Sequence, residues 1–261
     1  MNIDNDYTIG HDHVICEDYS LSYVDAQFGD AVAVVCDGCS ASIDVDLGAR
    51  ILAKSAQNTI LLHGLLDYDL FGATTILNAK KIFDVLPTLH QQALDATLLI
   101  AYVKDGLMTC YMYGDGVFIH KSKNNTRLVH IDFLSGAPAY LSYNLDPKRK
   151  ERYNTEANMS KHVVDTIDGS FEPKSLNPFQ PVIITSPVND GDIISVCSDG
   201  INSFRKADNE PISWKDLVEE YAGYKNFTGE FVKRRMNAFK RKCAKELTTH
   251  SDDISVASII I

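Results

Sequence analysis

The residues AVAVVCDGC, from Ala31 to Cys39, decide how the rest of the chain is interpreted. Residues 31–35 are all apolar and include three valines, a β-branched residue that favours strands. A short apolar run of this kind predicts a strand buried on both faces. The run ends at Asp37-Gly38, where a carboxylate is followed by a residue without a side chain, so that the backbone carbonyl can approach a ligand closely. The stretch therefore predicts a core strand whose end carries ligand oxygens.

Acidic residues stand at the edges of other apolar runs as well. The further positions are Glu17-Asp18, Asp115 within Gly114-Asp115-Gly116, Asp199-Gly200 and Asp252-Asp253. Because Asp-Gly is also a common turn pair, a single instance indicates only a turn. Five such positions in one chain predict carboxylates that converge, and oxygen ligands are those that Mg²⁺ and Mn²⁺ prefer. Two such ions would lower the pKa of a bridging water and clamp a phosphoryl group for in-line attack.

The remaining pattern predicts many strands and a few long helices. Strands are expected at 31–35, 95–103, 107–113, 117–120, 127–133, 182–185, 193–197 and 254–261, and helices at 45–60, 74–85, 213–221 and 229–247. The first helix has Ser40, Ser42 or Asp44 as its capping residue. Because the elements do not alternate regularly as βαβ units, antiparallel sheets flanked by helices are favoured, an α+β fold.

Length and composition limit the classes of protein that the chain can be. With 261 residues it is expected to form a single domain over 1–261, with a polar, Pro-rich excursion or small subdomain at 143–181. A net charge of -10 argues against a nucleic-acid binder. No apolar run approaches the roughly 20 residues of a membrane helix, and the start MNIDNDY lacks a signal-peptide pattern. We therefore expect a cytoplasmic protein whose six cysteines are reduced.

Charge is unevenly distributed along the chain. Residues 1–49 contain ten acidic residues and no Lys or Arg, which predicts that something cationic sits among them. By contrast, residues 225–246 contain eight Lys or Arg and two acids. The apolar residues of that segment have helical spacing, namely Val232, Met236, Phe239, Cys243 and Leu247. The segment predicts a surface helix with a basic outer face, for which holding a phosphorylated substrate is a secondary interpretation.

Six motifs in a fixed order give the chain a family resemblance. They are Cys16-Glu17-Asp18-Tyr19, Val34-Val35-Cys36-Asp37-Gly38, Ala96-Thr97-Leu98-Leu99, Tyr113-Gly114-Asp115-Gly116, Cys197-Ser198-Asp199-Gly200 and Asp252-Asp253-Ile254-Ser255-Val256. Each motif alone is weak, but the ordered series spans almost the whole chain. It resembles the metal-dependent serine/threonine protein phosphatases (type 2C, PPM).

The resemblance implies a four-layer αββα sandwich and a centre of two Mg²⁺ or Mn²⁺ ions. By position, the implied direct ligands are Asp37 as the bridge, the Gly38 carbonyl on one ion, and Asp199 and Asp252 on the other. Glu17 and Asp18 would act mainly through water. In this family an activated water attacks phosphorus directly, without a covalent phosphoenzyme.

The chain departs from the family pattern at four positions. His13 stands where the family often has an arginine that grips the substrate phosphate, and Asp253 stands where it usually has asparagine. His13 could donate to phosphate, act as a general acid, or be a surface residue. Cys39 replaces the histidine proposed as general acid in eukaryotic members. Ser203 replaces the acid expected near a third metal shared by Asp115 and Asp199, so two ions are expected. These departures indicate a divergent bacterial-type member.

Competing motifs carry less weight. Cys36-x-x-Cys39 is a single pair with Asp37-Gly38 in its middle, which does not favour zinc or redox chemistry. His11-x-His13 is too little for a zinc site. Asp44-x-Asp46 is similar to the motif of aspartyl-phosphate phosphatases, but it opens an expected helix, where capping is the better interpretation.

Together these patterns predict a phosphatase that hydrolyses phosphoserine or phosphothreonine in a protein substrate from a Ser/Thr kinase pathway. The basic segment Lys148 to Arg152 is expected to help draw in acidic substrates. Two alternatives stay open: a regulatory module that binds metal and phosphorylated partners with weak or no turnover, and a phosphatase for a small phosphorylated molecule. Neither a nucleic acid nor a membrane is an expected partner.

Overall fold

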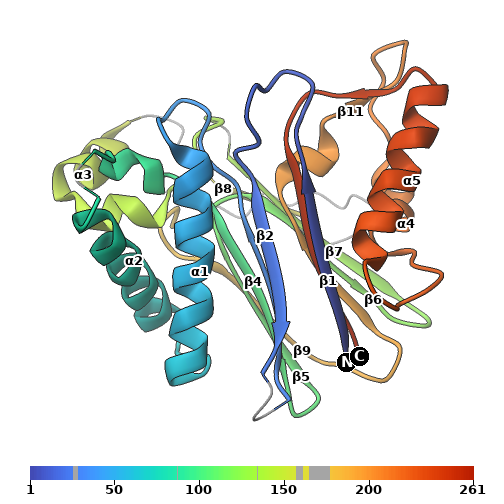
Figure 1. Ribbon diagram of the computed structural model, residues 1–261, viewed down its shortest axis with the longest axis horizontal. Helices are drawn as coiled ribbons and strands as arrows, with labels where there is room; N and C mark the ends of the chain where they lie inside the picture. The colour runs from blue at the N-terminus through green and yellow to red at the C-terminus, as the bar shows by residue number, and fades with distance from the viewer. Residues whose placement is uncertain (26–28, 87, 134, 157–160, 165–176) are drawn as a thin grey trace.

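The computed structural model describes residues 1–25, 29–86, 88–133, 135–156, 161–164 and 177–261. Two antiparallel sheets stack face to face, and helices cover both outer faces (Figure 1). The expected αββα sandwich is therefore confirmed. Within the described residues, no helix combines the length and the apolar character needed to cross a membrane.

Each sheet is built from strands that are distant in sequence. The first has the order β1 (Asn2–Thr8), β13 (Ile254–Ile260), β10 (Ile193–Cys197), β6 (Gly116–Lys121), β7 (Thr126–Phe133) and β8 (Lys161–Val164). The second has the order β2 (Tyr19–Val24), β3 (Ala31–Cys36), β4 (Leu98–Lys104), β5 (Leu107–Tyr113) and β9 (Val182–Pro187). A small ribbon pairs β11 (Phe204–Arg205) with β12 (Thr249–His250). The two ends of the chain lie together, because Asn2 pairs with Ile260 (Figure 1).

The strand β3 shows why its sequence is apolar throughout. Ala31, Ala33 and Val35 point into the core between the two sheets. Val32, Val34 and Cys36 point the other way, into the core beneath the helices. Because successive residues of a strand face opposite sides, only a strand in the middle of four layers needs apolar residues at every position.

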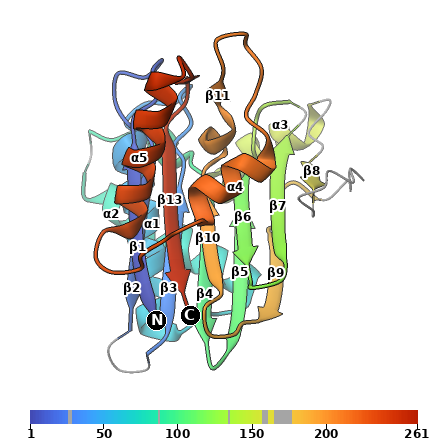
Figure 2. The ribbon, with the colours of Figure 1, turned by 90° about the vertical axis from the view of Figure 1, so that its right-hand side faces the viewer.

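The helices pack as two pairs, one on each outer face. Helices α1 (Val45–His63) and α2 (Tyr68–Asp84) cover the five-stranded sheet. Helices α4 (Trp214–Ala222) and α5 (Phe231–Lys245) cover the six-stranded sheet (Figure 2). The short helices η1 (Gln91–Leu94), η2 (Leu141–Leu145), η3 (Asp199–Asn202) and α3 (Pro147–Thr155) connect these layers.

Several expected boundaries were wrong, for identifiable reasons. Helix α2 begins at Tyr68 rather than near 74, because the side chain of Asp67 accepts the N–H groups of Asp69 and Leu70 and so caps it. Asp44 is the residue before α1, but its side chain makes no capping hydrogen bond. The strands β1 and β2 were not expected, since the acidic sequence of β1 resembles a loop.

Two other expectations concern the polar segment and the last helix. Of the excursion at 143–181, the residues that can be described form parts of η2, α3, β8 and the run up to β9, while 157–160 and 165–176 lie outside the described residues.

Helix α5 buries the expected Val232, Met236, Phe239 and Cys243, but it ends at Lys245. The fifth member of that stripe, Leu247, was wrongly assigned to the buried face, because its side chain is 73 % exposed.

A close backbone approach yields the first prediction. A Cβ added at Gly48 in α1 would lie 1.6 Å from the carbonyl oxygen of Ala93, a backbone atom of η1. Gly48→Ala should therefore lower the free energy of unfolding by about 3 kcal/mol, measured by urea denaturation. The matched control is Gly72→Ala in α2, whose added Cβ would meet the side chain of Tyr113 at 3.0 Å. That change should cost less than about 1 kcal/mol, because the alanine gains helix propensity. Equal effects of the two changes would contradict this account.

Candidate metal centre

The acidic motifs meet at one end of the sandwich. Asp37 directly follows β3, Asp199 begins η3 two residues after β10 ends, and Asp252 lies two residues before β13. Asp115 lies in the turn between β5 and β6, and Glu17-Asp18 lies just before β2. Since neighbouring strands are antiparallel, strands that end and strands that begin share this edge. The fold thus brings together the carboxylates that the sequence singled out.

Asp37 lies at the centre of this group. Desolvation raises its pKa well above the ordinary value, and the charges of the four neighbouring carboxylates, those of Asp18, Asp199, Asp252 and Asp115, raise it further. Its backbone is fixed by Thr97, the residue just before β4: its N–H donates to the Thr97 hydroxyl at 3.1 Å, and its carbonyl accepts the Thr97 N–H at 2.8 Å. Thr97 of the Ala-Thr motif therefore fixes the position of Asp37.

Asp18 is the buried member of the group. Desolvation raises its pKa to about 7, while the nearby hydroxyls of Ser198 and Ser255 act in the opposite direction. Neither of its buried carboxylate oxygens accepts a hydrogen bond from the described part of the chain. A buried carboxylate without donors is costly unless a cation or water satisfies it. The donor set therefore fits a hard cation with oxygen ligands.

Three glycines allow the backbones to converge here. A Cβ at Gly38 would lie 2.9 Å from the carbonyl oxygen of Glu17. The segment 252–253 runs between Gly10 and Gly200, where an added Cβ would meet its backbone at 2.3 and 1.7 Å. Because no side chain separates these segments, Asp252 lies close to Asp199. The pKa of Asp252 is raised to about 6, first by desolvation and then by the negative charge of Asp199.

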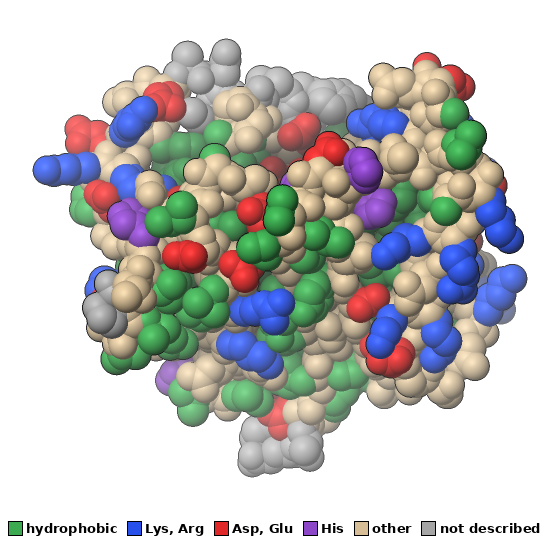
Figure 3. Space-filling view, turned by 45° about the horizontal axis from the view of Figure 1, so that its top comes forward, with side chains coloured by type: hydrophobic (Ala, Val, Ile, Leu, Met, Phe, Trp, Pro, Cys, Tyr) green, Lys and Arg blue, Asp and Glu red, His purple; other side chains and the backbone are tan. Residues whose placement is uncertain are grey.

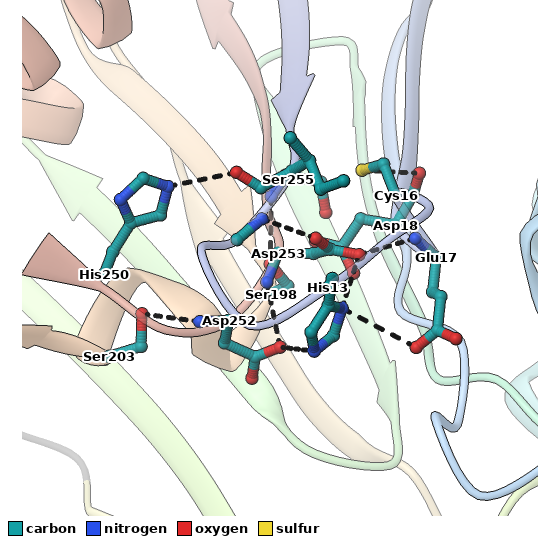
Figure 4. A network of polar contacts seen from close by, with 12 residues as sticks. His13, Cys16, Glu17, Asp18, Ser198, Ser203, His250, Asp252, Asp253 and Ser255 are labelled. Carbon is teal, nitrogen blue, oxygen red and sulfur yellow. Dashed lines mark hydrogen bonds and ion pairs between the residues drawn. The ribbon is translucent and has the colours of Figure 1, made fainter.

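His13 closes the group on one side. Its Nδ1 lies 3.0 Å from Asp253 and 3.7 Å from Glu17, and its Nε2 lies 3.4 Å from Asp252 (Figure 4). Burial alone would lower the pKa of His13, but the hydrogen bond to Asp253 and the surrounding carboxylates outweigh it and raise the pKa. One ligand atom each from His13, Glu17 and Asp253 lie within 4.8 Å of one another, close enough to hold a cation together.

Asp253 was not among the expected site residues, yet it organises the loop that carries them. Its carboxylate accepts the N–H of Gly10 at 2.7 Å and the N–H of Glu17 at 2.5 Å. These bonds tie the 10–17 loop to the start of β13. The signal in the sequence was the second acid of the Asp252-Asp253 pair, where only the first was weighed as a ligand.

Ser203 and Asp115, the positions linked to a possible third metal, have identifiable surroundings in the structure. The hydroxyl of Ser203 accepts the backbone N–H of Asp252 at 3.4 Å and so helps to place that residue. The pKa of Asp115 is raised well above its ordinary value by desolvation, then by Asp199, and then by Asp132 of β7, an acid that the sequence analysis did not consider.

The basic segment at 148–152 forms part of α3. Arg149 donates to both carboxylate oxygens of the buried Asp95, at 2.7 and 3.1 Å. The carbonyl of Asp95 accepts the N–H of Cys39 at 2.8 Å, so this ion pair supports the loop after Gly38. The expectation that Arg149 helps to attract substrates needs correction, because its charge is already paired.

Comparison with known proteins identifies the family. The family model described as Protein phosphatase 2C matches residues 10–240. The chain belongs to this family. No curated protein matches the sequence significantly.

Solved structures of the family share the fold at low sequence identity. A serine/threonine phosphatase of S. agalactiae is 12 % identical, with 99 % of this chain and 98 % of that chain covered and a TM-score of 0.59. The catalytic domain of PstP, solved in complex with two manganese ions, is 12 % identical, with 99 and 97 % covered and a TM-score of 0.56. SpoIIE of Bacillus subtilis is 14 % identical, with 100 and 63 % covered and a TM-score of 0.57. At such identities the likeness shows the fold alone.

The raised carboxyl pKa values predict how stability depends on pH without divalent cations. A carboxyl whose folded pKa exceeds its unfolded value contributes stability at low pH, and this contribution is lost as pH rises through the folded pKa. For Asp252 and Asp18 these values are about 6 and about 7, against 3.8 unperturbed. With a chelator present, the melting temperature should fall by roughly 5 °C or more between pH 5 and pH 8, measured by differential scanning fluorimetry.

Manganese supplies the control for this prediction. Millimolar Mn²⁺ should flatten the dependence, because a bound cation replaces the protons that offset the repulsion. In the chelator, Asp37→Asn should make the melting temperature less dependent on pH. The same change should abolish the effect of Mn²⁺ on the melting temperature. A melting temperature that rises from pH 5 to pH 8 in the chelator would show that the carboxylates do not repel one another as described.

Proposed function

We propose that this chain is a metal-dependent phosphatase that hydrolyses phosphoserine or phosphothreonine in proteins. The observation that carries the proposal is the convergence of Asp18, Asp115, Asp199 and Asp252 on Asp37. Burial first, and then these four charges, raise the pKa of Asp37 well above its ordinary value, and bound cations would offset both effects. Family membership favours Mg²⁺ or Mn²⁺ over other ions, as do the oxygen donors.

The residues divide into those that would hold the ions and those that would place the ligands. Direct ligands would be Asp37, the Gly38 carbonyl, Asp199 and Asp252, with Glu17, Asp18 and Asp115 around them. Bound divalent ions lower the pKa of water and polarise a phosphoryl group. The hydrogen bonds of Thr97 hold Asp37 in place, and those of Asp253 hold Glu17, so the carboxylates are oriented before any substrate arrives.

His13 is the residue best placed to contact the substrate phosphate. Its Nδ1 lies 3.0 Å from Asp253, and the negative charge of that carboxylate favours a proton on this nitrogen. Its Nε2 faces Asp252 across 3.4 Å, a longer contact that a cation on Asp252 would weaken. In the imidazolium form, in which both ring nitrogens carry a proton, Nε2 is then able to donate to a phosphoryl oxygen, the role that an arginine has in many members of the family.

A regulatory module with the same fold is the second candidate. The observation that favours it is Cys39, which occupies the position of the histidine proposed as general acid elsewhere in the family. The ordered carboxylates argue against it, because a module without turnover has no need to keep so strained a set of charges. For the phosphatase we propose a cytoplasmic protein substrate from a Ser/Thr kinase pathway, and for the regulatory module a phosphorylated protein partner.

Phosphate release tests the proposal directly. With Mn²⁺ or Mg²⁺ the chain should hydrolyse p-nitrophenyl phosphate and a phosphothreonine peptide, and a chelator should abolish both reactions. Asp37→Asn should lower kcat by about 100-fold or more, since even the groups that orient metal ligands contribute 10- to 100-fold. Binding of Mn²⁺ in calorimetry without release of phosphate from either substrate would instead favour the regulatory module.

His13 is tested with a matched pair of variants. His13→Ala should raise the KM for p-nitrophenyl phosphate about tenfold, because a charge-assisted hydrogen bond to phosphate is lost. His13→Arg should recover most of this loss, since the guanidinium also donates to phosphate. If both variants raise KM equally, His13 acts by supporting Asp253 rather than by binding phosphate.

A further inference from the structure

A groove of about 580 Å³ opens beside the carboxylates, between the loop after β1 and the C-terminal half of α5. Its described lining consists of Ile9, Gly10, His11, His13, Lys240, Cys243, Ala244, Leu247, Thr248, Thr249 and His250. His13 belongs both to this lining and to the carboxylate group, through its contacts with Asp252 and Asp253. The groove is therefore continuous with the proposed reaction site.

The described lining lacks acidic side chains, although the molecule as a whole is acidic. Lys240 supplies its positive charge, while desolvation lowers the pKa of His250 and so favours the neutral imidazole. Lys240 and three histidines line the groove, and none of its described lining residues carries a carboxylate. The chain as a whole has 35 acidic residues and a net charge of -10. Figure 3 shows histidine side chains on this face between acidic side chains and the Lys and Arg side chains that cover α5. Such a lining is complementary to an anionic ligand.

Lys240 is held in the groove wall rather than extended into solvent. Its Nζ donates to the hydroxyl of Thr8 at 2.6 Å, which leaves further N–H groups for a ligand. The loop opposite is fixed as well, since Nε2 of His250 lies 3.2 Å from the carbonyl oxygen of Ile9. Because both walls are ordered by their own contacts, little conformational freedom is lost when a ligand binds.

Leu247 forms the rim of the groove in a backbone conformation that leucine rarely adopts. It follows α5 in the left-handed region, with φ 55°, where the N–H of Thr248 donates to the carbonyl of Cys243 at 2.9 Å. This helix-terminating position strongly favours glycine. Here a leucine occupies it with its side chain 73 % exposed, and Ile9 adds a side chain that is 41 % exposed. A strained, exposed apolar residue at the mouth of a site indicates a contact with a ligand.

We propose that this groove binds the segment of the phosphoprotein substrate next to the phosphorylated residue. An acidic side chain of that segment would meet Lys240 and His11, and a bulky apolar side chain would cover Ile9 and Leu247. The inference rests on the proposed function, and it names its substrate class: phosphoproteins with an acidic and an apolar residue beside the phosphothreonine or phosphoserine.

The test compares matched phosphothreonine peptides with p-nitrophenyl phosphate, which is too small to fill the groove. One peptide carries Asp and Leu beside the phosphothreonine, a second has Lys in place of Asp, and a third has Ser in place of Leu. This set of three is made twice, once with the varied residues before the phosphothreonine and once with them after it. In one of the two sets, the first peptide should have a kcat/KM about tenfold above those of the other two peptides. The variants Lys240→Gln and Leu247→Gly should each lower the ratio of its kcat/KM to that of p-nitrophenyl phosphate about fivefold.

Matched controls separate binding from stability. Lys245→Gln removes a lysine from the same helix outside the groove, and Leu77→Ala removes an exposed leucine from α2, and both should preserve the ratio. Leu247→Gly should keep the melting temperature or raise it by up to about 3 °C, because glycine relieves the left-handed strain. A loss of peptide hydrolysis together with a stable fold is the result expected only of a ligand contact.

The outcomes distinguish this inference from the proposed function. Hydrolysis of all peptides at equal rates would overturn the groove and leave the phosphatase intact. If no substrate is hydrolysed, fluorescence anisotropy of the labelled phosphopeptides decides: binding that depends on Asp, Leu and Lys240 supports the groove in a protein without turnover. Binding that ignores all three overturns it.

Discussion

Repulsion among buried and half-buried carboxylates at one end of the sandwich is the constraint on which the site depends. Left alone, Asp37 and its neighbours would separate or take up protons. Part of what holds them together does not involve their own charges: the two backbone hydrogen bonds between Asp37 and Thr97, one donated by each residue, the close approaches at Gly10, Gly38 and Gly200, and the core strands behind them. The contacts of His13 and of the Asp253 carboxylate add to these. The free energy gained by packing the four layers thus offsets the repulsion between these carboxylates.

The sequence allowed the layers and the acidic centre to be predicted because both depend on local patterns. The run AVAVVC is typical of a strand with apolar layers on both sides, and Asp37, Asp199 and Asp252 each stand within two residues of an apolar strand. Glu17-Asp18 instead precede the mixed sequence of β2. Strand β1 escaped prediction because its alternating Asp and Asn residues look like a loop, and only pairing with β13 makes it a strand. The roles of Asp253 and of Arg149 in α3 could not be predicted either, since they depend on partners far away in the chain.

Two departures from the family pattern prove to be in contact. Asparagine is replaced by Asp253 and arginine by His13, and the two side chains lie 3.0 Å apart. The additional negative charge is met by an imidazole whose pKa it raises. In the sequence these looked like two separate changes at opposite ends of the chain. In the fold they form one pair, which couples the loop after β1 to the start of β13.

The pairing of the first strand with the last has a practical consequence for engineering. Asn2 lies opposite Ile260 at the far end of β1 and β13, whereas Thr8 and Ile254 lie at the carboxylate end, roughly 20 Å away along the strands. A short linker could therefore join residue 261 to residue 1 without crossing the site, and new ends could be opened at the Asp105-Gly106 turn between β4 and β5. Such a circular permutant would turn β1 and β13 into a covalent hairpin, with the carboxylate group at its open end.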